Sequence, residues 1–271
     1  MTFSIVARSA DGAAWGVAVA SKFLAVGAAV PAGEPGAGAV ATQAHANLAY
    51  KAQALELLRT GTEAQAVLDA LVAGDDGRAT RQVGVVDVEG RSASYTGGEC
   101  HDWAGGRAGP GYAVQGNILT GEDVLDAMQR AWLEAGPDTS FPARLLAALA
   151  AGDAAGGDRR GRQSASLLVV RRAGGYGGSS DVEVDLRVDD APDPVRELGR
   201  LLRLHELYFG RPDPATLLPL EGALAQEVQA LVEALGHPSL ESWAGVENYE
   251  ERLVEGSIDP LVLERLRAAG S

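Results

Sequence analysis

Met1-Thr2-Phe3-Ser4-Ile5-Val6-Ala7-Arg8 opens the chain, and its composition indicates a β-strand that starts almost at once. A chain end usually frays unless it is tied into a sheet or a similar element, so we expect Thr2 to be held in place. Removal of Met1 would leave a hydroxyl and an α-amine on Thr2, which is the threonine form of a nucleophile with its own base. The α-amine titrates at roughly 7.7–8.0, close to the pH at which a general base works best. A strand that merely begins with Met-Thr is the alternative interpretation.

A second strand is predicted from Trp15 to Lys22, and a glycine-containing turn should join it to the first strand as a hairpin. Side chains alternate along a strand, so Thr2 and Ser4 share a face and line one cleft. In one register Thr2 faces Lys22 across the hairpin, on a face where the neighbouring residues of the second strand are small. A slip by one residue pairs Thr2 with Ser21 instead and turns Lys22 away. Both registers are compatible with the sequence.

The composition excludes several classes of partner. The 271 residues carry a formal net charge of −14, whereas nucleic acids and anionic membranes are bound by clustered positive charge. No apolar run approaches the roughly 18–20 residues of a transmembrane helix, and the start lacks the basic and apolar regions of a signal peptide. We therefore expect a cytoplasmic protein with no membrane or nucleic-acid partner.

Cysteine and histidine are too sparse to suggest a metal site. Cys100 is the only cysteine, so no intramolecular disulfide or thiolate cluster can form. The histidines show no metal-binding spacing, and no dinucleotide or Walker motif is present. His101 and Asp102 follow Cys100 directly, but neighbours in an extended chain face opposite ways and make a poor catalytic dyad. We predict neither a metal nor a cofactor.

The order of the remaining segments predicts an α+β fold. Strands, two helices, strands, two helices and strands follow one another, which favours layers of antiparallel hairpins over alternating βαβ units. A boundary rich in Asp and Pro near 189–194 separates this part from a helical region, so we predict domains at 1–190 and 195–271. The expected strands lie at 40–44, 82–88, 92–95, 111–116, 164–170 and 182–188, and the expected helices at 47–58, 63–73, 122–134, 141–150, 194–209, 221–235, 239–254 and 260–268.

Six segments, in order, resemble those of a bacterial and archaeal family known only as domain of unknown function number one thousand and twenty-eight. The resemblance covers about residues 2–190. It implies the four-layer αββα sandwich of the N-terminal-nucleophile hydrolases, in which the nucleophile leads the first strand. That position corresponds to Thr2, and Lys22 resembles the lysine that lowers the pKa of the nucleophile in proteasome-like members. The segments are Thr2–Arg8, Gly16–Phe23, Ala41–Ala44, Gln82–Asp87, Gly111–Asn117 and Gly156–Ala165.

The C-terminal region carries a second resemblance. Leu217–Gly222 and Val246–Arg252 resemble parts of a helical module that is often fused to this family and is described as peptidoglycan-binding. The resemblance implies a peptidoglycan fragment as a partner. Because no export signal is seen, packing or assembly into a homo-oligomer is the alternative role.

Two amide-bearing segments are candidates for substrate contacts. Gln43 and Asn47 precede a predicted helix, and both amides and helix N-termini stabilise an oxyanion. Gln115 and Asn117 end a predicted strand around a glycine that allows close backbone approach. A capped helix and a turn with a self-bonding Asn explain the two segments equally well.

The loop before the strand at 164–170 is the candidate for anion recognition. It carries Asp158, Arg159 and Arg162, and arginine forks match carboxylate and phosphate groups. Ser164 would face the same cleft as Thr2 if the two strands are neighbours. A solvated basic loop is the alternative.

Together these features predict an amide hydrolase. Thr2 attacks a carbonyl, its α-amine moves the proton, and Lys22 supplies a positive field. Donors around Gln115–Asn117 or at Gln43 hold the oxyanion, and the arginines bind an anionic group on a small amide or peptide-like substrate. A non-catalytic protein that binds a small ligand on the same fold is the alternative.

Overall fold

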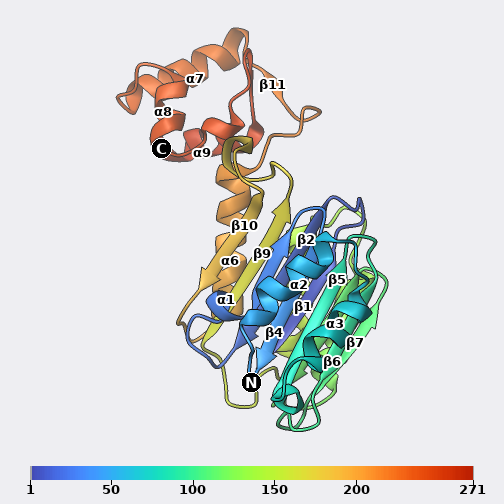
Figure 1. Ribbon diagram of the computed structural model, residues 1–271. Helices are drawn as coiled ribbons and strands as arrows, with labels where there is room; N and C mark the ends of the chain where they lie inside the picture. Colours follow the sequence, from blue (N-terminus) through green and yellow to red (C-terminus); the bar gives the residue numbers. More distant parts are fainter. Residues whose placement is uncertain (1, 271) are drawn as a thin grey trace. The chain divides into compact units, whose positions relative to one another are not determined.

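The computed structural model describes residues 2–270 (Figure 1). Antiparallel sheets and helices build it, which confirms the expected mixture of α and β structure. The chain divides into two compact units between Leu202 and Arg203, and not near residue 190 as the composition indicated. The division falls there because α6 (Pro194–Phe209) is one continuous helix whose first half belongs to the core of the N-terminal unit.

The larger sheet of the N-terminal unit has six strands in the order β10-β9-β2-β1-β8-β7, all antiparallel to their neighbours. Its first strand is therefore an interior strand, flanked by β2 and β8. The expected hairpins at the N-terminus and before α6 are both present. The strands are β1 (Thr2–Arg8), β2 (Ala14–Ser21), β7 (Gly105–Gly109), β8 (Tyr112–Asn117), β9 (Ser164–Arg171) and β10 (Val182–Val188).

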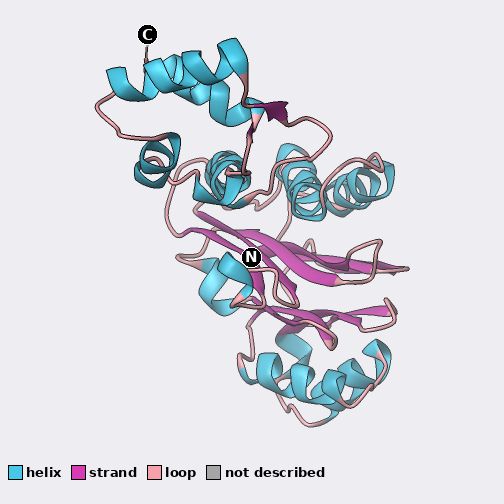
Figure 2. Cartoon of the chain, turned by 90° about the horizontal axis from the view of Figure 1, so that it is seen from above, coloured by secondary structure: helices cyan, strands magenta, loops and turns pink. Residues whose placement is uncertain are grey.

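A second sheet of four strands lies face to face with the first (Figure 2). Its order is β3-β4-β5-β6, from β3 (Pro31–Glu34), β4 (Gly38–Ala44), β5 (Arg81–Asp87) and β6 (Ser92–Thr96). Small and β-branched side chains fill most of the space between the sheets, which suits strands buried on both faces. They include Val6, Val17, Val19, Ala39, Ala41, Val86 and Ala113.

Helices cover the outer face of each sheet (Figure 2). The six-stranded sheet packs on α4 (Asp123–Glu134), α5 (Phe141–Ala154) and the first half of α6. The four-stranded sheet packs on α2 (Ala49–Arg59) and α3 (Ala64–Ala73). Each helix turns one apolar stripe inward, as amphipathic spacing requires; in α4 that stripe is Val124, Leu125, Met128 and Trp132. A short helix, α1 (Val26–Ala29), connects β2 to β3.

The C-terminal unit is a small helical body. It contains α7 (Gly222–Ala234), α8 (Leu240–Val246) and α9 (Pro260–Ala269), and a two-stranded sheet of β11 (Leu218–Pro219) and β12 (Ser257–Ile258). The helix expected over 239–254 ends at Val246, because Asn248 takes a left-handed conformation with φ 61° and stops the helical path. Among residues 2–270, no helix has the length and apolar character that a bilayer crossing demands.

The packing of α5 on the larger sheet generates a first prediction. Leu149 is fully buried in this core, so Leu149→Ala should lower the free energy of unfolding by about 2–5 kcal/mol through lost packing and a residual cavity. Leu133→Ala on α4 is the matched control, because that side chain is 59% exposed and should change the free energy by less than about 0.5 kcal/mol. Urea unfolding measures both, and equal costs would contradict this packing.

Candidate functional site

The register of the first hairpin decides what lies beside Thr2. Phe3 pairs with Ala20, so Thr2 lies opposite Ser21, and their hydroxyl oxygens are 3.1 Å apart. Lys22 is one residue further on and faces the other way, where its Nζ donates to the carbonyl of Arg162 at 3.3 Å. This corrects the expectation that Lys22 lies beside Thr2. The slipped register holds because it sends Val17 and Val19 into the core between the two sheets.

Asn117 flanks Thr2 on its other side. The pairing of β1 with β8 sets Thr2 opposite Asn117 and Ser4 opposite Gln115. Adjacent strands in one sheet present paired residues on the same face, so Thr2, Ser21 and Asn117 form a polar row across three strands. Thr2 is 6% exposed, and the other two are buried more deeply.

Buried amides from both sheets connect to this row. Gln43, on β4, donates from its Nε2 to Gln82 Oε1 at 2.8 Å and to the carbonyls of Thr2 and Gln115 at 3.3 Å. Its Oε1 accepts from Ser4 Oγ at 2.7 Å. Gln115 in turn donates to Ser4 Oγ at 2.6 Å. Gln43, Gln115 and Ser4, three residues proposed from the sequence, therefore lie together, but they bond to one another between the sheets.

Gln82, on β5, is the residue of this network that sequence reasoning missed. Its Oε1 accepts from Asn117 Nδ2 at 2.8 Å, and its Nε2 donates to the carbonyl of Gly116 at 2.7 Å. It therefore fixes the amide of Asn117. A signal was present in the sequence, because Gln82 and Gly84 share one face of a strand. A Cβ at Gly84 would lie 2.1 Å from Gln115 Oε1, so the glycine provides the space for that amide.

A pocket of about 330 Å³ opens at the end of the sheets where Asn117 lies. Two of its lining residues, Ala44 and Ile118, have positive φ angles of 65° and 49°, which is costly for residues with a Cβ and most of all for a β-branched one. Such strain is concentrated at binding and catalytic sites. The described lining residues are Ala44, His45, Thr80, Glu99, Cys100, His101, Asn117, Ile118 and Arg160.

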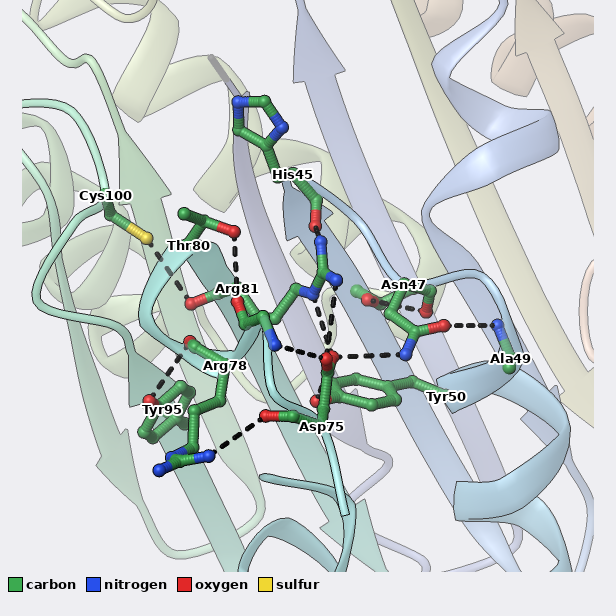
Figure 3. Close-up of polar contacts among 12 residues, drawn as sticks. His45, Asn47, Ala49, Tyr50, Asp75, Arg78, Thr80, Arg81, Tyr95 and Cys100 are labelled. Carbon is green, nitrogen blue, oxygen red and sulfur yellow. Dashed lines mark hydrogen bonds and ion pairs between the residues drawn. The ribbon is translucent and has the colours of Figure 1, made fainter. Parts of the chain in front are cut away.

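A carboxylate clamp centred on Asp75 lies beside His45 and Thr80, two residues that line this pocket (Figure 3). Asp75 Oδ2 accepts hydrogen bonds from Arg81 Nε at 2.8 Å, Tyr50 OH at 2.8 Å and Asn47 Nδ2 at 3.1 Å. Arg81 also donates to the carbonyl of His45, whose ring points away from the clamp. Asn47, proposed as a substrate contact, is used here instead, and its Oδ1 accepts from the Ala49 amide at the start of α2.

The pKa values of Asp75 and Tyr50 are shifted within the clamp. The hydrogen bond from Arg81, followed by that from Tyr50, holds the pKa of Asp75 far below its usual range. Burial, together with the hydrogen bond to Asp75, raises the pKa of Tyr50. Burial also raises the pKa of Cys100, whose Sγ lies 3.3 Å from the carbonyl of Arg81. Cys100 therefore stays a thiol near neutral pH and is a poor nucleophile.

The loop that carries Arg159 and Arg162 lies close to the polar row that contains Thr2, but its residues serve different roles. Arg162 pairs with Asp153 at 2.8 and 3.0 Å, and Arg159 is exposed and is not among the described lining residues. Ser164 donates to the carbonyl of Phe23 and accepts from the Val26 amide, so it fixes the connection from β2 to α1. The pocket is instead lined by Arg160, which sequence reasoning did not single out among its neighbours.

The clamp predicts a pH-dependent contribution to stability. The carboxylate of Asp75 has a lower pKa in the folded chain than in the unfolded chain, so its contribution is complete above about pH 4 and is lost as the pH falls through the folded value. Asp75→Asn should therefore lower the free energy of unfolding near neutral pH, and its difference from wild type should shrink in acid. Urea unfolding at roughly pH 7 and pH 3 measures this. Asp76→Asn, at an exposed neighbouring carboxylate, is the control, and a difference that does not change with pH would contradict the clamp.

The chain is similar to the crystal structure of protein SPO2555 from Silicibacter pomeroyi, with a TM-score of 0.68 and 31% identity over 83% of this chain and 92% of that chain. No curated protein matches the chain. The family model of DUF1028, described as a family of unknown function, matches residues 2–198. The chain thus belongs to the DUF1028 family.

Proposed function

We propose that this protein is an amide hydrolase of the N-terminal-nucleophile type, with Thr2 as its nucleophile. The observation that carries the proposal is the position of Thr2 beside Asn117, a residue that lines the pocket. Two antiparallel sheets enclosed by helices also agree with the αββα sandwich of that class. A small amide or peptide-like molecule in the pocket would bring its carbonyl toward the end of β1.

The proposed reaction begins with cleavage of the peptide bond before Thr2, which frees its α-amine. That amine is neutral in a useful fraction near pH 7.7–8.0, and it takes the proton of the Thr2 hydroxyl as Oγ1 attacks the carbonyl carbon. The C–N bond of the substrate then breaks, and the departing amine receives the proton. Water hydrolyses the resulting ester and regenerates Thr2. Ser21, 3.1 Å from the threonine hydroxyl, orients it in this scheme.

Asn117 is the proposed oxyanion donor. Its Nδ2 is fixed by the bond to Gln82, and fixed donors stabilise developing charge without reorganising during the reaction. Gln82 is itself held by its donation to the carbonyl of Gly116, and Gln43, which donates to Gln82 Oε1, also donates to the carbonyl of Thr2. Lys22 has no part in this mechanism, because its Nζ donates to the carbonyl of Arg162, and the α-amine and the amide donors supply the base and the charge stabilisation.

Burial of Thr2 favours a second candidate, a non-catalytic protein that binds a small ligand in the same pocket. Thr2 is 6% exposed, and the lysine of proteasome-like sites has no counterpart at Lys22, which lies on the opposite face. In this alternative the polar row is a structural network, and the pocket binds its ligand without breaking a bond.

The nucleophile has a direct test. Intact-mass measurement should show a chain that begins at Thr2, and Thr2→Ala should reduce kcat/KM on a panel of small amides on the order of 10³-fold or more. Thr2→Ser should keep measurable activity because it retains the hydroxyl, and Lys22→Gln, the matched control, should change little. Full activity with residue 1 retained would rule out the mechanism, and ligand binding without hydrolysis would establish the binder.

The oxyanion donor generates a separate prediction. Asn117→Ala should lower kcat by about 10²–10³-fold and leave KM almost unchanged, because the lost bond forms only in the transition state. Gln82→Ala should reproduce part of this loss by releasing the Asn117 amide. Thermal unfolding of both variants separates this effect from loss of the fold. An increase in KM at constant kcat would assign Asn117 to ground-state binding instead.

A further inference from the structure

The loop from Gly156 to Gln163 is tied to both strands that flank Thr2. On the side of β2, the amide of Lys22 donates to Asp158 Oδ2 at 2.7 Å. On the side of β8, the amide of Arg159 donates to the carbonyl of Ile118 at 3.3 Å, and Leu119 forms a β-bridge with Asp158. Because β1 lies between these two strands, the loop is held at the end of the sheet where Thr2 lies.

Asp158 fixes the position of Arg160 within this loop. Its side chain is 3% exposed, and Oδ1 accepts the backbone amide of Arg160 at 2.8 Å. The guanidinium also pairs with Asp158 Oδ2 at 3.4 Å, and the Arg160 side chain is 44% exposed. Asp158 thus anchors Arg160 through both its backbone and its side chain, and Arg160 lines the pocket together with Asn117 and Ile118.

The charge of the pocket is set by few groups. Among its described lining residues, Arg160 is the one guanidinium and Glu99 the one carboxylate. The whole chain carries a net charge of −14, which repels anions at long range, so an anionic ligand needs a local cation. An arginine fork binds a carboxylate through two parallel charge-assisted hydrogen bonds. Glu99 provides an acceptor for an N–H group of the same molecule.

We infer that the pocket binds small amides that carry a carboxylate, such as N-acyl amino acids or short peptides, and that Arg160 binds this carboxylate. The inference rests on the proposed function and names its substrate class. A cavity of about 330 Å³ lies at the lower end of the range for ligand pockets, which suits a ligand of this size. With the carboxylate on Arg160, the amide of the ligand extends along the pocket toward Asn117.

The neighbouring arginines make it possible to distinguish a specific role of Arg160 from a general effect of positive charge. Arg162 is paired with Asp153, and Arg159 is exposed and outside the described lining. All three residues lie in the same loop and carry the same charge. Only the position of Arg160 places it at the pocket, so Arg159 offers a matched control.

The experiment measures binding in a Thr2→Ala background, which prevents turnover. Calorimetric titration compares a panel of N-acetyl amino acids with their neutral carboxamides at millimolar concentration. We expect the carboxylates to bind about 10–100-fold more tightly, as a charge-assisted bidentate contact provides. Arg160→Gln should abolish that preference, Arg160→Lys should keep part of it, and Arg159→Gln should keep all of it. Thermal unfolding verifies that each variant is folded.

Several results would overturn the inference. These are equal binding of carboxylates and carboxamides, no binding of either, and a preference that survives Arg160→Gln. The proposed function fails in a different way. A carboxylate preference that depends on Arg160, with no hydrolysis by the wild-type chain, would support the pocket assignment and reject the hydrolase. Hydrolysis without any carboxylate preference would support the hydrolase and reject the assignment of Arg160 as the carboxylate-binding residue.

Discussion

The hydrogen bonds of one buried side chain, Gln43, constrain how the two sheets are aligned with one another. Gln43 extends from the four-stranded sheet and bonds to the backbone of two strands of the six-stranded sheet, at Thr2 and Gln115. A buried amide that loses its partners costs about 1–3 kcal/mol, so sliding one sheet over the other would leave several polar groups unpaired. Apolar contacts between the sheets do not discriminate in this way, because valine and alanine pack well in neighbouring positions. The amides therefore set the alignment that brings Thr2, Ser21 and Asn117 into one row.

Much of this architecture could be predicted from the sequence. The hairpins and the paired helices follow from alternation, turn residues and helix-capping signals, all of which are local. The register of the first hairpin could not be chosen, because Ser21 and Lys22 are both polar residues at the end of the same strand. The choice depends on a sheet from a distant part of the chain, which accepts Val17 and Val19 on its side. A difference of one residue moved Lys22 to the opposite face.

Several of the residues that the sequence singled out lie together, although their contacts could not be predicted. Thr2, Ser4, Gln43, Gln115 and Asn117 lie together in the structure, and Ser164 is on the strand beside β2. The sequence could not show that most of these amides bond to one another, nor that Asn47 belongs to the Asp75 clamp. It also could not separate three arginines in a single loop, since only tertiary contacts with Asp153 and Asp158 distinguish them.

The side chain of Gln115 fills the space beside Gly84, so the residues at positions 84 and 115 restrict each other's evolution. Any side chain there would collide with the amide of Gln115, which comes from the other sheet. A lineage that replaced the glycine would have to shorten the residue at 115 as well, and Ser4 and Gln43 would then lose a neighbour. These residues are expected to change together or not at all, so their covariation across related sequences would record the contact between the two sheets.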